Sequence, residues 1–79
     1  MAKPKFGKYR HFKSKKKEYE VIGIAHHSET LEELAIYRAL YDSAKFGKNA
    51  LWARPIDLFL GQAEVNGKKI PRFKYLGDN

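Results

Sequence analysis

Residues that can act as acids, bases or ligands are concentrated between positions 26 and 54 of this chain. The run His26-His27-Ser28-Glu29-Thr30 combines imidazole, carboxylate and hydroxyl groups. His27, Glu29 and Thr30 have the residue types of a base, an orienting carboxylate and a hydroxyl group, which indicates a minor hydrolytic enzyme acting through His27 and Glu29. The competing interpretation is a turn braced by its own polar side chains. A chain this short offers little concavity for a substrate, which favours the turn.

The same histidines are candidate metal ligands. A structural metal site needs about four ligands around one ion. Adjacent residues of extended chain point to opposite faces, so His26 and His27 cannot easily share an ion. His11 with one of them and Glu29 or Glu33 would reach three ligands, but none of the standard ligand spacings is present. We therefore predict no metal site and no other cofactor.

A second group of candidates combines arginine with aromatic rings. Arg38 alternates in register with Leu34 and Ile36, so it must reach solvent, pair with a carboxylate or line a pocket. A guanidinium beside aromatic planes is a common arrangement for binding a planar or anionic ligand. The alternative is a structural ion pair, for which the nearest carboxylates are Glu29, Glu33 and Asp57. The candidate ligand-binding residues are His27, Glu29, Thr30, Tyr37, Arg38, Trp52 and Arg54.

The positive charge of the chain belongs to one end. Residues 1–17 contain eight Lys or Arg and no acid, whereas residues 18–79 contain eight Lys or Arg against nine Asp or Glu. The net charge of +7 is therefore +8 in the first segment and −1 in the remainder. Such an arm attracts phosphates or acidic partners, although a solvated, partly disordered end has the same composition. The candidate phosphate contacts are Lys13, Lys15, Lys16 and Lys17.

Length and composition limit the class of protein. A chain of 79 residues forms one domain with a modest core. It has no cysteine, which excludes disulfides and thiol nucleophiles and fits a reducing compartment. No run approaches the roughly 20 apolar residues of a membrane span, and no apolar segment of a secretory signal follows the basic start. We expect a cytoplasmic protein with a flexible basic tail at residues 1–6 and a single compact β domain at residues 7–79.

The hydrophobic pattern of the first half predicts short strands. Residues 9–12 and 19–24 have the spacing of a hairpin, in which Gly23 marks a bulge or a close backbone approach. Aliphatic and aromatic side chains then alternate, which favours a turn at 27–33 and a strand at 34–41. The alternative is a single helix at 29–45, opened by a capping box that begins at Thr30.

The second half is predicted to contain further strands and one helical turn. Residues 42–49 read as a loop, followed by a short strand that Pro55 ends. One helical turn is expected near 55–60, with proline at its start and glycine after its end. Asn66-Gly67 is a strong hairpin signal. The extended segments expected in this half are 51–54, 62–65, 68–70 and 71–76. Five to six short strands with one helical turn indicate a mainly β fold, a small, strongly bent barrel.

The order of several motifs is similar to that of a known family. The motifs are Tyr9-Arg10-His11-Phe12-Lys13, Tyr19–Ile24, His27-Ser28-Glu29-Thr30, Tyr37-Arg38-Ala39-Leu40-Tyr41, Trp52-Ala53-Arg54-Pro55, Phe59 and Pro71-Arg72-Phe73. Together, from about residue 7 to residue 76, they resemble the small bacterial family catalogued as domain of unknown function 1653. The resemblance implies a compact, SH3-like single domain and brings no established activity or catalytic residues. Family members often carry a glycine in the first turn, where this chain has Ser14 and a lysine run.

The combined features favour a small non-enzymatic binding module. The basic N-terminal arm favours nucleic acid as the partner, with RNA or a ribonucleoprotein first. Five tyrosines permit base stacking, although a domain this small needs most of them for its core. The alternative partner is a peptide or an acidic protein, and a membrane partner is not expected.

Overall fold

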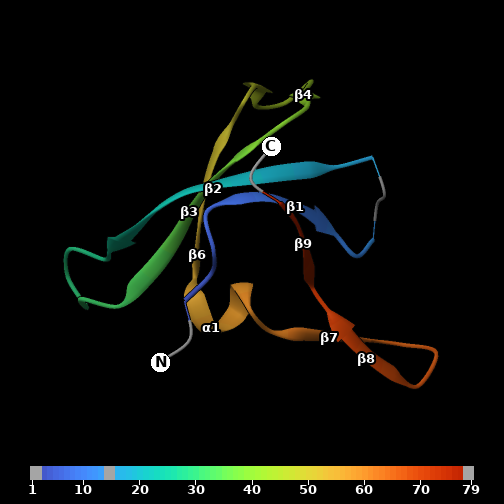
Figure 1. Ribbon diagram of the computed structural model, residues 1–79. Coiled ribbons are helices and arrows are strands. Elements are labelled where there is room, and N and C mark those ends of the chain that lie inside the picture. The colour runs from blue at the N-terminus through green and yellow to red at the C-terminus, as the bar shows by residue number, and fades with distance from the viewer. Residues whose placement is uncertain (1–2, 14–15, 78–79) are drawn as a thin grey trace.

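Five antiparallel strands form the central sheet of the computed structural model, which describes residues 3–13 and 16–77 (Figure 1). The strands are β1 (Gly7–His11), β2 (Glu18–His26), β3 (Glu33–Ala39), β6 (Leu51–Pro55) and β9 (Phe73–Gly77). Their order across the sheet is β6-β3-β2-β1-β9, and all neighbours run antiparallel. The predicted first hairpin is the β1–β2 pair.

Two short hairpins and one helix complete the described chain. They are β4 (Asp42–Ser43) with β5 (Gly47–Lys48), β7 (Gln62–Val65) with β8 (Lys68–Pro71), and α1 (Ile56–Phe59). The mainly β class and the helical turn within 55–60 are therefore confirmed. The sheets are not closed into a barrel, because the outer strands β6 and β9 do not pair. In sequence, α1 and the β7–β8 hairpin lie between these two strands.

The turn between β7 and β8 has the predicted geometry. Asn66 and Gly67 both have positive φ, of 53° and 78°. Such values are required at the two central positions of a type I′ hairpin turn, and asparagine followed by glycine adopts them at low cost.

Gly23 marks a bulge in β2, as predicted. The pairing register between β2 and β3 shifts between Val21 and Gly23. A side chain added at Gly23 would meet nothing within 4 Å, so the alternative of a close backbone approach is wrong. A bulge bends its strand and increases the local twist, which helps a long β2 curve around the core.

The segment after β2 is a turn and a strand, so the helix considered for 29–45 is wrong. The turn is closed by two backbone hydrogen bonds, from the N–H of His27 to the carbonyl of Glu32 and from the N–H of Leu31 to the carbonyl of His27. In β3, the residues with buried side chains are Ala35, Tyr37 and Ala39. The period-two alternation of this segment therefore correctly predicts a strand. The side of β3 that carries Tyr37 faces the core.

Arg38 lies on the opposite side of β3, and its predicted partners are wrong. It pairs with Glu20, its direct neighbour on β2: the Arg38 Nε donates to Oε1 at 2.8 Å and Nη2 lies 2.6 Å from the same oxygen. The expected partners were Glu29, Glu33 and Asp57. Cross-strand register places a carboxylate beside Arg38 that is 18 residues away in sequence. Such an exposed pair contributes about 0–1 kcal/mol.

The core is built from aromatic rings on one face of the sheet. Phe59 of α1 is only 1% exposed and stacks on Phe73 of β9, with 4.4 Å between ring centroids. Tyr9 meets Phe59 edge-on at 5.1 Å. Pro55 directly precedes the helix as its N-cap residue, and Gly61 follows the C-cap residue Leu60. Trp52 is not part of this core: it is 37% exposed, and its ring contacts that of Phe46.

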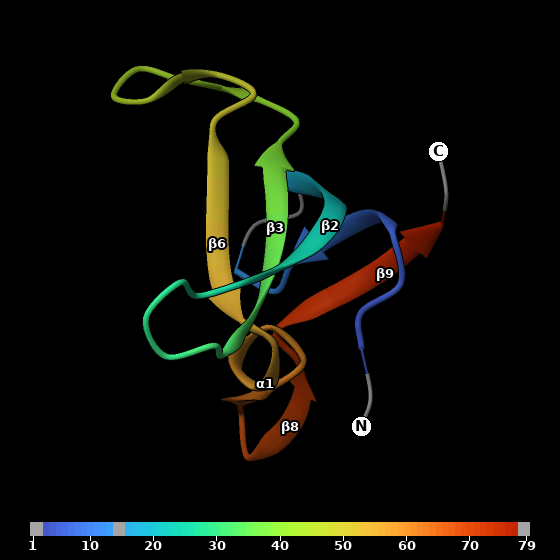
Figure 2. The ribbon, with the colours of Figure 1, turned by 90° about the vertical axis from the view of Figure 1, so that its left-hand side faces the viewer.

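The helix and the β4–β5 hairpin lie at opposite ends of β3 and β6 (Figure 2). At the helix end, Ile56 and Phe59 cover the aromatic face of the sheet. The aromatic face therefore continues beyond the part that α1 covers, toward the β4–β5 hairpin.

Candidate functional site

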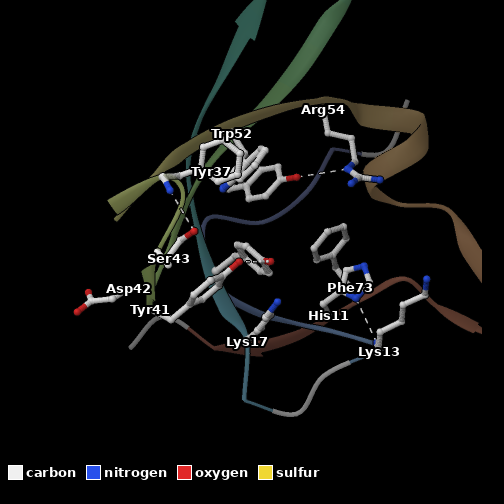
Figure 3. A pocket seen from close by; sticks show the side chains of 13 residues that line it. His11, Lys13, Lys17, Tyr37, Tyr41, Asp42, Ser43, Trp52, Arg54 and Phe73 are labelled. Carbon is white, nitrogen blue, oxygen red and sulfur yellow. Dashed lines mark hydrogen bonds between the residues drawn. The ribbon is translucent and has the colours of Figure 1, made fainter. Parts of the chain in front are cut away.

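A pocket of about 780 Å³ opens on this uncovered part of the aromatic face (Figure 3). Its walls are aromatic, and its polar groups include three permanently charged cations. The aromatic residues are Tyr19, Tyr37, Tyr41, Phe46, Trp52 and Phe73; the polar ones are His11, Lys13, Lys17, Asp42, Ser43 and Arg54. Pockets that bind small ligands commonly enclose about 300–1,000 Å³ and combine apolar walls with a few polar groups.

Strand register brings the predicted residues of β3 and β6 together. Tyr37 pairs directly with Trp52, and Ala35 pairs with Arg54. Since alternate residues of a strand share a face, Trp52 and Arg54 both project toward the pocket. The absence of a side chain beyond Cβ at Ala35 leaves space beside Arg54.

Arg54 is held by two contacts within the pocket. Its Nε donates a hydrogen bond to the Tyr37 hydroxyl at 3.3 Å, and its guanidinium carbon lies 5.4 Å from the centre of the Phe73 ring. A guanidinium on an aromatic face is attracted by the ring quadrupole. No acceptor for the terminal amino groups of Arg54 is found in the described part of the chain, so these groups can donate to a ligand.

The β4–β5 hairpin closes the opposite side of the pocket, and the sequence predicted only a loop there. The Ser43 hydroxyl accepts hydrogen bonds from the N–H groups of Lys45 and Phe46, at 3.3 and 3.1 Å. This turn holds the Phe46 ring edge-on against Trp52, with 5.0 Å between centroids. Gly47 has a positive φ of 84°, which glycine adopts easily. Ser43 and Gly47 were the residues in the sequence that could have predicted this turn.

Two tyrosines that line the pocket, Tyr19 and Tyr41, contact each other. The hydroxyls of Tyr19 and Tyr41 lie 2.8 Å apart. Burial raises the pKa of Tyr19 above its usual value, and the hydrogen bond with Tyr41 raises it further. Tyr19 therefore remains protonated at neutral pH. The Nζ of Lys17 lies 5.6 Å from the centre of the Tyr41 ring, so a cation covers that ring.

His11 lies at the other end of the pocket, where the surrounding charges are positive. Its Nδ1 accepts a hydrogen bond from the N–H of Lys13 at 3.1 Å, so the neutral ring carries its proton on Nε2. Burial lowers the pKa of His11, and repulsion lowers it further, from Arg54, Arg72, Lys13 and Lys17. The sequence reasoning considered His11 only as a metal ligand.

We expect His11 to make the protein less stable in mild acid. Its folded-state pKa is below the unfolded value of about 6.5, so stability is fully present above that pH and is lost as the pH falls through the folded-state pKa. The melting temperature of the unmodified protein should therefore fall more than that of His11→Asn on acidification from about pH 7.5 to about pH 5.5. Equal falls in the two proteins would contradict this assignment.

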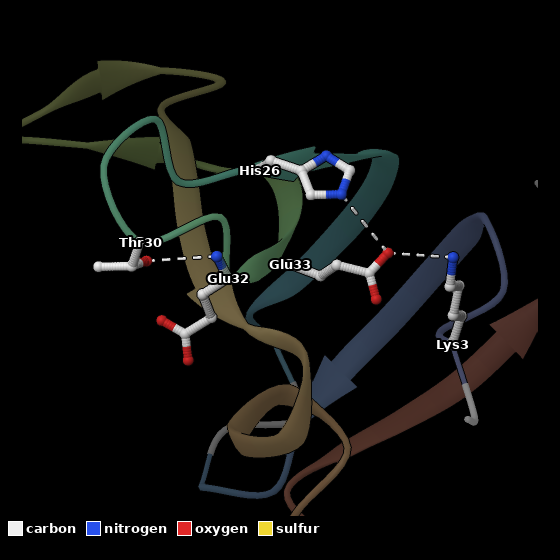
Figure 4. A network of polar contacts seen from close by, with 5 residues as sticks. All are labelled: Lys3, His26, Thr30, Glu32 and Glu33. Atoms are coloured by element: carbon white, nitrogen blue, oxygen red, sulfur yellow. Dashed lines mark hydrogen bonds and ion pairs between the residues drawn. The ribbon is translucent and has the colours of Figure 1, made fainter.

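The predicted group His27, Glu29 and Thr30 lies outside the pocket. Nδ1 of His27 accepts hydrogen bonds from the N–H groups of Glu29 and Thr30, at 3.2 and 3.3 Å. The Thr30 hydroxyl in turn accepts from the N–H of Glu32 at 3.2 Å (Figure 4). These side chains brace their own turn, and the arrangement gives no support to a histidine base acting on a substrate.

Next to this turn, Glu33 is the centre of a small ionic network (Figure 4). Its Oε2 lies 3.1 Å from Nζ of Lys3 and 3.9 Å from Nε2 of His26. Among residues 3–13 and 16–77, no group of three or more His, Asp or Glu side chains is arranged to hold a metal ion.

The candidate phosphate contacts are divided by the fold. Lys13 and Lys17 line the pocket, whereas Lys16 is exposed and does not. Lys15 lies outside the described residues. Within the described ranges, no helix is long and apolar enough to cross a membrane.

Comparison with known proteins identifies relatives of the chain. Residues 7–75 match the family described as "Protein of unknown function (DUF1653)". The chain is similar to a crystal structure of a protein belonging to DUF1653 from Bordetella bronchiseptica, with 28% sequence identity and a TM-score of 0.81. That alignment covers 95% of this chain and 90% of the other. A search of curated proteins gives no match.

Proposed function

The chain belongs to the DUF1653 family, and we propose that it is a non-enzymatic module that binds single-stranded RNA through the pocket of Trp52 and Arg54. One observation carries the proposal: aromatic rings and three permanent cations line a pocket in which Asp42 is the single acid among the residues that the structure describes. Aromatic faces stack on bases, and cations contact phosphates. Aromatic rings for stacking and cations for phosphate contacts therefore line the same pocket.

The exposed Trp52 ring is the proposed stacking surface. Trp52 and Phe46 meet edge to face and not as parallel stacked rings. This contact therefore leaves one face of the Trp52 ring available for stacking on a base. Stacking of a base on an aromatic side chain contributes about 1–3 kcal/mol by alanine substitution. It also tolerates any base, because every base has a π-face.

The proposal favours single strands over duplexes for a steric reason. A base enters a hollow lined by side chains only when it is free of its stack and its pairing partner.

We also propose that the bent sheet is an open version of the SH3-like arrangement, which generally binds ligands through loops and aromatic side chains. A peptide or acidic protein partner would use the same aromatic surface, and the following experiment separates the two partners.

The protein contains a single tryptophan, so its intrinsic fluorescence reports directly on Trp52. Titration with a short single-stranded RNA should quench this fluorescence, and the matching duplex should bind more weakly. Arg54→Gln should weaken RNA binding at least about tenfold, since a hydrogen bond to a charged group contributes about 1.5–3 kcal/mol. Arg38→Gln removes the same charge from the opposite face and should leave affinity nearly unchanged.

Two results would contradict the proposal. Fluorescence that does not respond to RNA but responds to an acidic peptide would favour the protein-partner alternative. Equal losses of affinity in Arg54→Gln and Arg38→Gln would show that the pocket is not the binding site.

A further inference from the structure

The end of the pocket around His11 gathers positive charge from four segments of the chain. We call this group of residues the His11 corner: His11 on β1, Lys13 and Lys17 in the β1–β2 connection, Arg54 on β6, and Arg72 just before β9. The first four line the pocket, and the charge of Arg72 acts on His11 together with theirs. Figure 3 shows His11, Lys13 and Arg54 on the same side of the pocket.

Within residues 3–13 and 16–77, no carboxylate forms an ion pair with the cations of the His11 corner. The ion pairs of the described residues involve Lys3, His26 and Arg38, with Glu33 and Glu20 as their acidic partners. Asp42 lines the pocket but lies on its far side, in the β4–β5 hairpin (Figure 3). Like charges gathered on a partly buried surface repel one another, and an anion bound among them relieves that repulsion.

The polar atoms of the His11 corner are also donors. Because Nδ1 of His11 accepts the N–H of Lys13, its neutral ring presents an N–H at Nε2. Nε of Arg54 already donates to the Tyr37 hydroxyl, and the terminal amino groups of Arg54 are further donors. Lysine ammonium groups can donate hydrogen bonds but cannot accept them. A ligand that satisfies this set must be rich in acceptor oxygens.

The amount of charge distinguishes two kinds of phosphate. An internal phosphodiester carries one negative charge, whereas a phosphate monoester carries about 1.5 to 2 near neutral pH and presents three acceptor oxygens. The three permanent cations that line the pocket with His11, together with the charge of Arg72 that also acts on His11, match the monoester better.

We propose that the His11 corner is a subsite for the terminal phosphate monoester of a nucleotide whose base stacks on Trp52. The placement of the base rests on the proposed function; the phosphate subsite rests on the charges and donors of the corner. Trp52 and Arg54 are two residues apart on one strand, which separates their backbones by about 6.5–7 Å. One nucleotide can bridge such a distance from base to phosphate. The monoester comes either from the end of an RNA strand or from a free mononucleotide.

The test compares one short single-stranded RNA in 5′-phosphorylated, 3′-phosphorylated and unphosphorylated forms, together with AMP. One phosphorylated end should bind at least about tenfold more tightly than the unphosphorylated strand, as expected for an added charge-assisted hydrogen bond. Lys13→Gln/Lys17→Gln should remove this preference. Lys68→Gln/Lys69→Gln makes the same change of charge on β8, away from the pocket, and should retain it.

The outcomes separate this inference from the proposed function. Equal affinity for all three RNA forms would overturn the phosphate subsite and leave RNA binding intact. Binding of AMP without binding of any RNA would retain the subsite, overturn RNA binding and identify the free nucleotide as the source. In parallel, inorganic phosphate should shift the NMR signals of the His11 ring; unshifted signals, with no binding of AMP or RNA, would overturn both.

Discussion

Replacing Phe59 with alanine should largely unfold the protein. The ring is 1% exposed, stacks on Phe73 and meets Tyr9 edge-on, so its removal leaves a cavity at the centre of the aromatic core. Truncation of a buried phenylalanine costs about 3–5 kcal/mol. A domain of this size without disulfides rarely gains more than about 3–5 kcal/mol from its core. The expected loss is therefore comparable to the whole stability.

Thermal denaturation followed by circular dichroism measures this effect. Leu58→Ala is a control on the same helix, because the Leu58 side chain is 54% exposed. It should melt close to the unmodified protein, whereas Phe59→Ala should show little folded signal at room temperature. A melting temperature of Phe59→Ala near that of the unmodified protein would contradict the structure of the core.

Replacing Lys13, Lys15, Lys16 and Lys17 with glutamine should produce the largest change in RNA affinity. Each lysine that contacts a phosphate releases counterions, so the logarithm of the affinity falls with the logarithm of salt concentration by roughly 0.7 per contact on single strands. If all four make such contacts, the variant should lose up to about three units of this slope. Phosphate contacts contribute affinity and little sequence information, so the loss should be similar for different RNA sequences.

Affinities measured at several salt concentrations test this prediction. A variant with Lys45, Lys48, Lys68 and Lys69 replaced by glutamine has the same net charge and changes no lysine of the N-terminal arm. It should retain most of the salt dependence. If the slope of log affinity against log salt falls equally in both variants, the overall charge of the protein attracts RNA. The lysines of the N-terminal arm would then make no specific phosphate contacts.

Local signals in the sequence predicted much of the fold. Asn66-Gly67 specified a hairpin turn, Gly23 specified a bulge, and alternation along 34–41 specified β3 in place of a helix. These features depend on residues close together in the chain. The β4–β5 hairpin was missed because strands of two residues are too short to show a period of two.

The partners of side chains could not be predicted in the same way. Arg38 was expected to reach Glu29 or Glu33, but the register between β2 and β3 places Glu20 opposite it. Barrel closure was likewise expected from the number of strands, although the pairing of the outer strands depends on how α1 and the β7–β8 hairpin are placed.

The composition of the pocket also depends on pairing between strands that are distant in the sequence. Tyr37, Trp52 and Arg54 were candidates because arginine and aromatic residues alternate in neighbouring segments, and register brings them together. His11 and Phe73 are 62 positions apart and meet only because β1 pairs with β9. No local pattern joins them, so the positive end of the pocket became visible only in three dimensions.

Titration of the unmodified protein with single-stranded RNA, from low to moderate salt, decides whether the pocket binds RNA. Fluorescence of Trp52 reports the occupancy of the pocket, and the salt series reports the phosphate contacts. Binding should quench the fluorescence, and the affinity should fall linearly on a log–log scale as salt increases. The absence of measurable RNA binding even at the lowest salt concentration would contradict the proposed function.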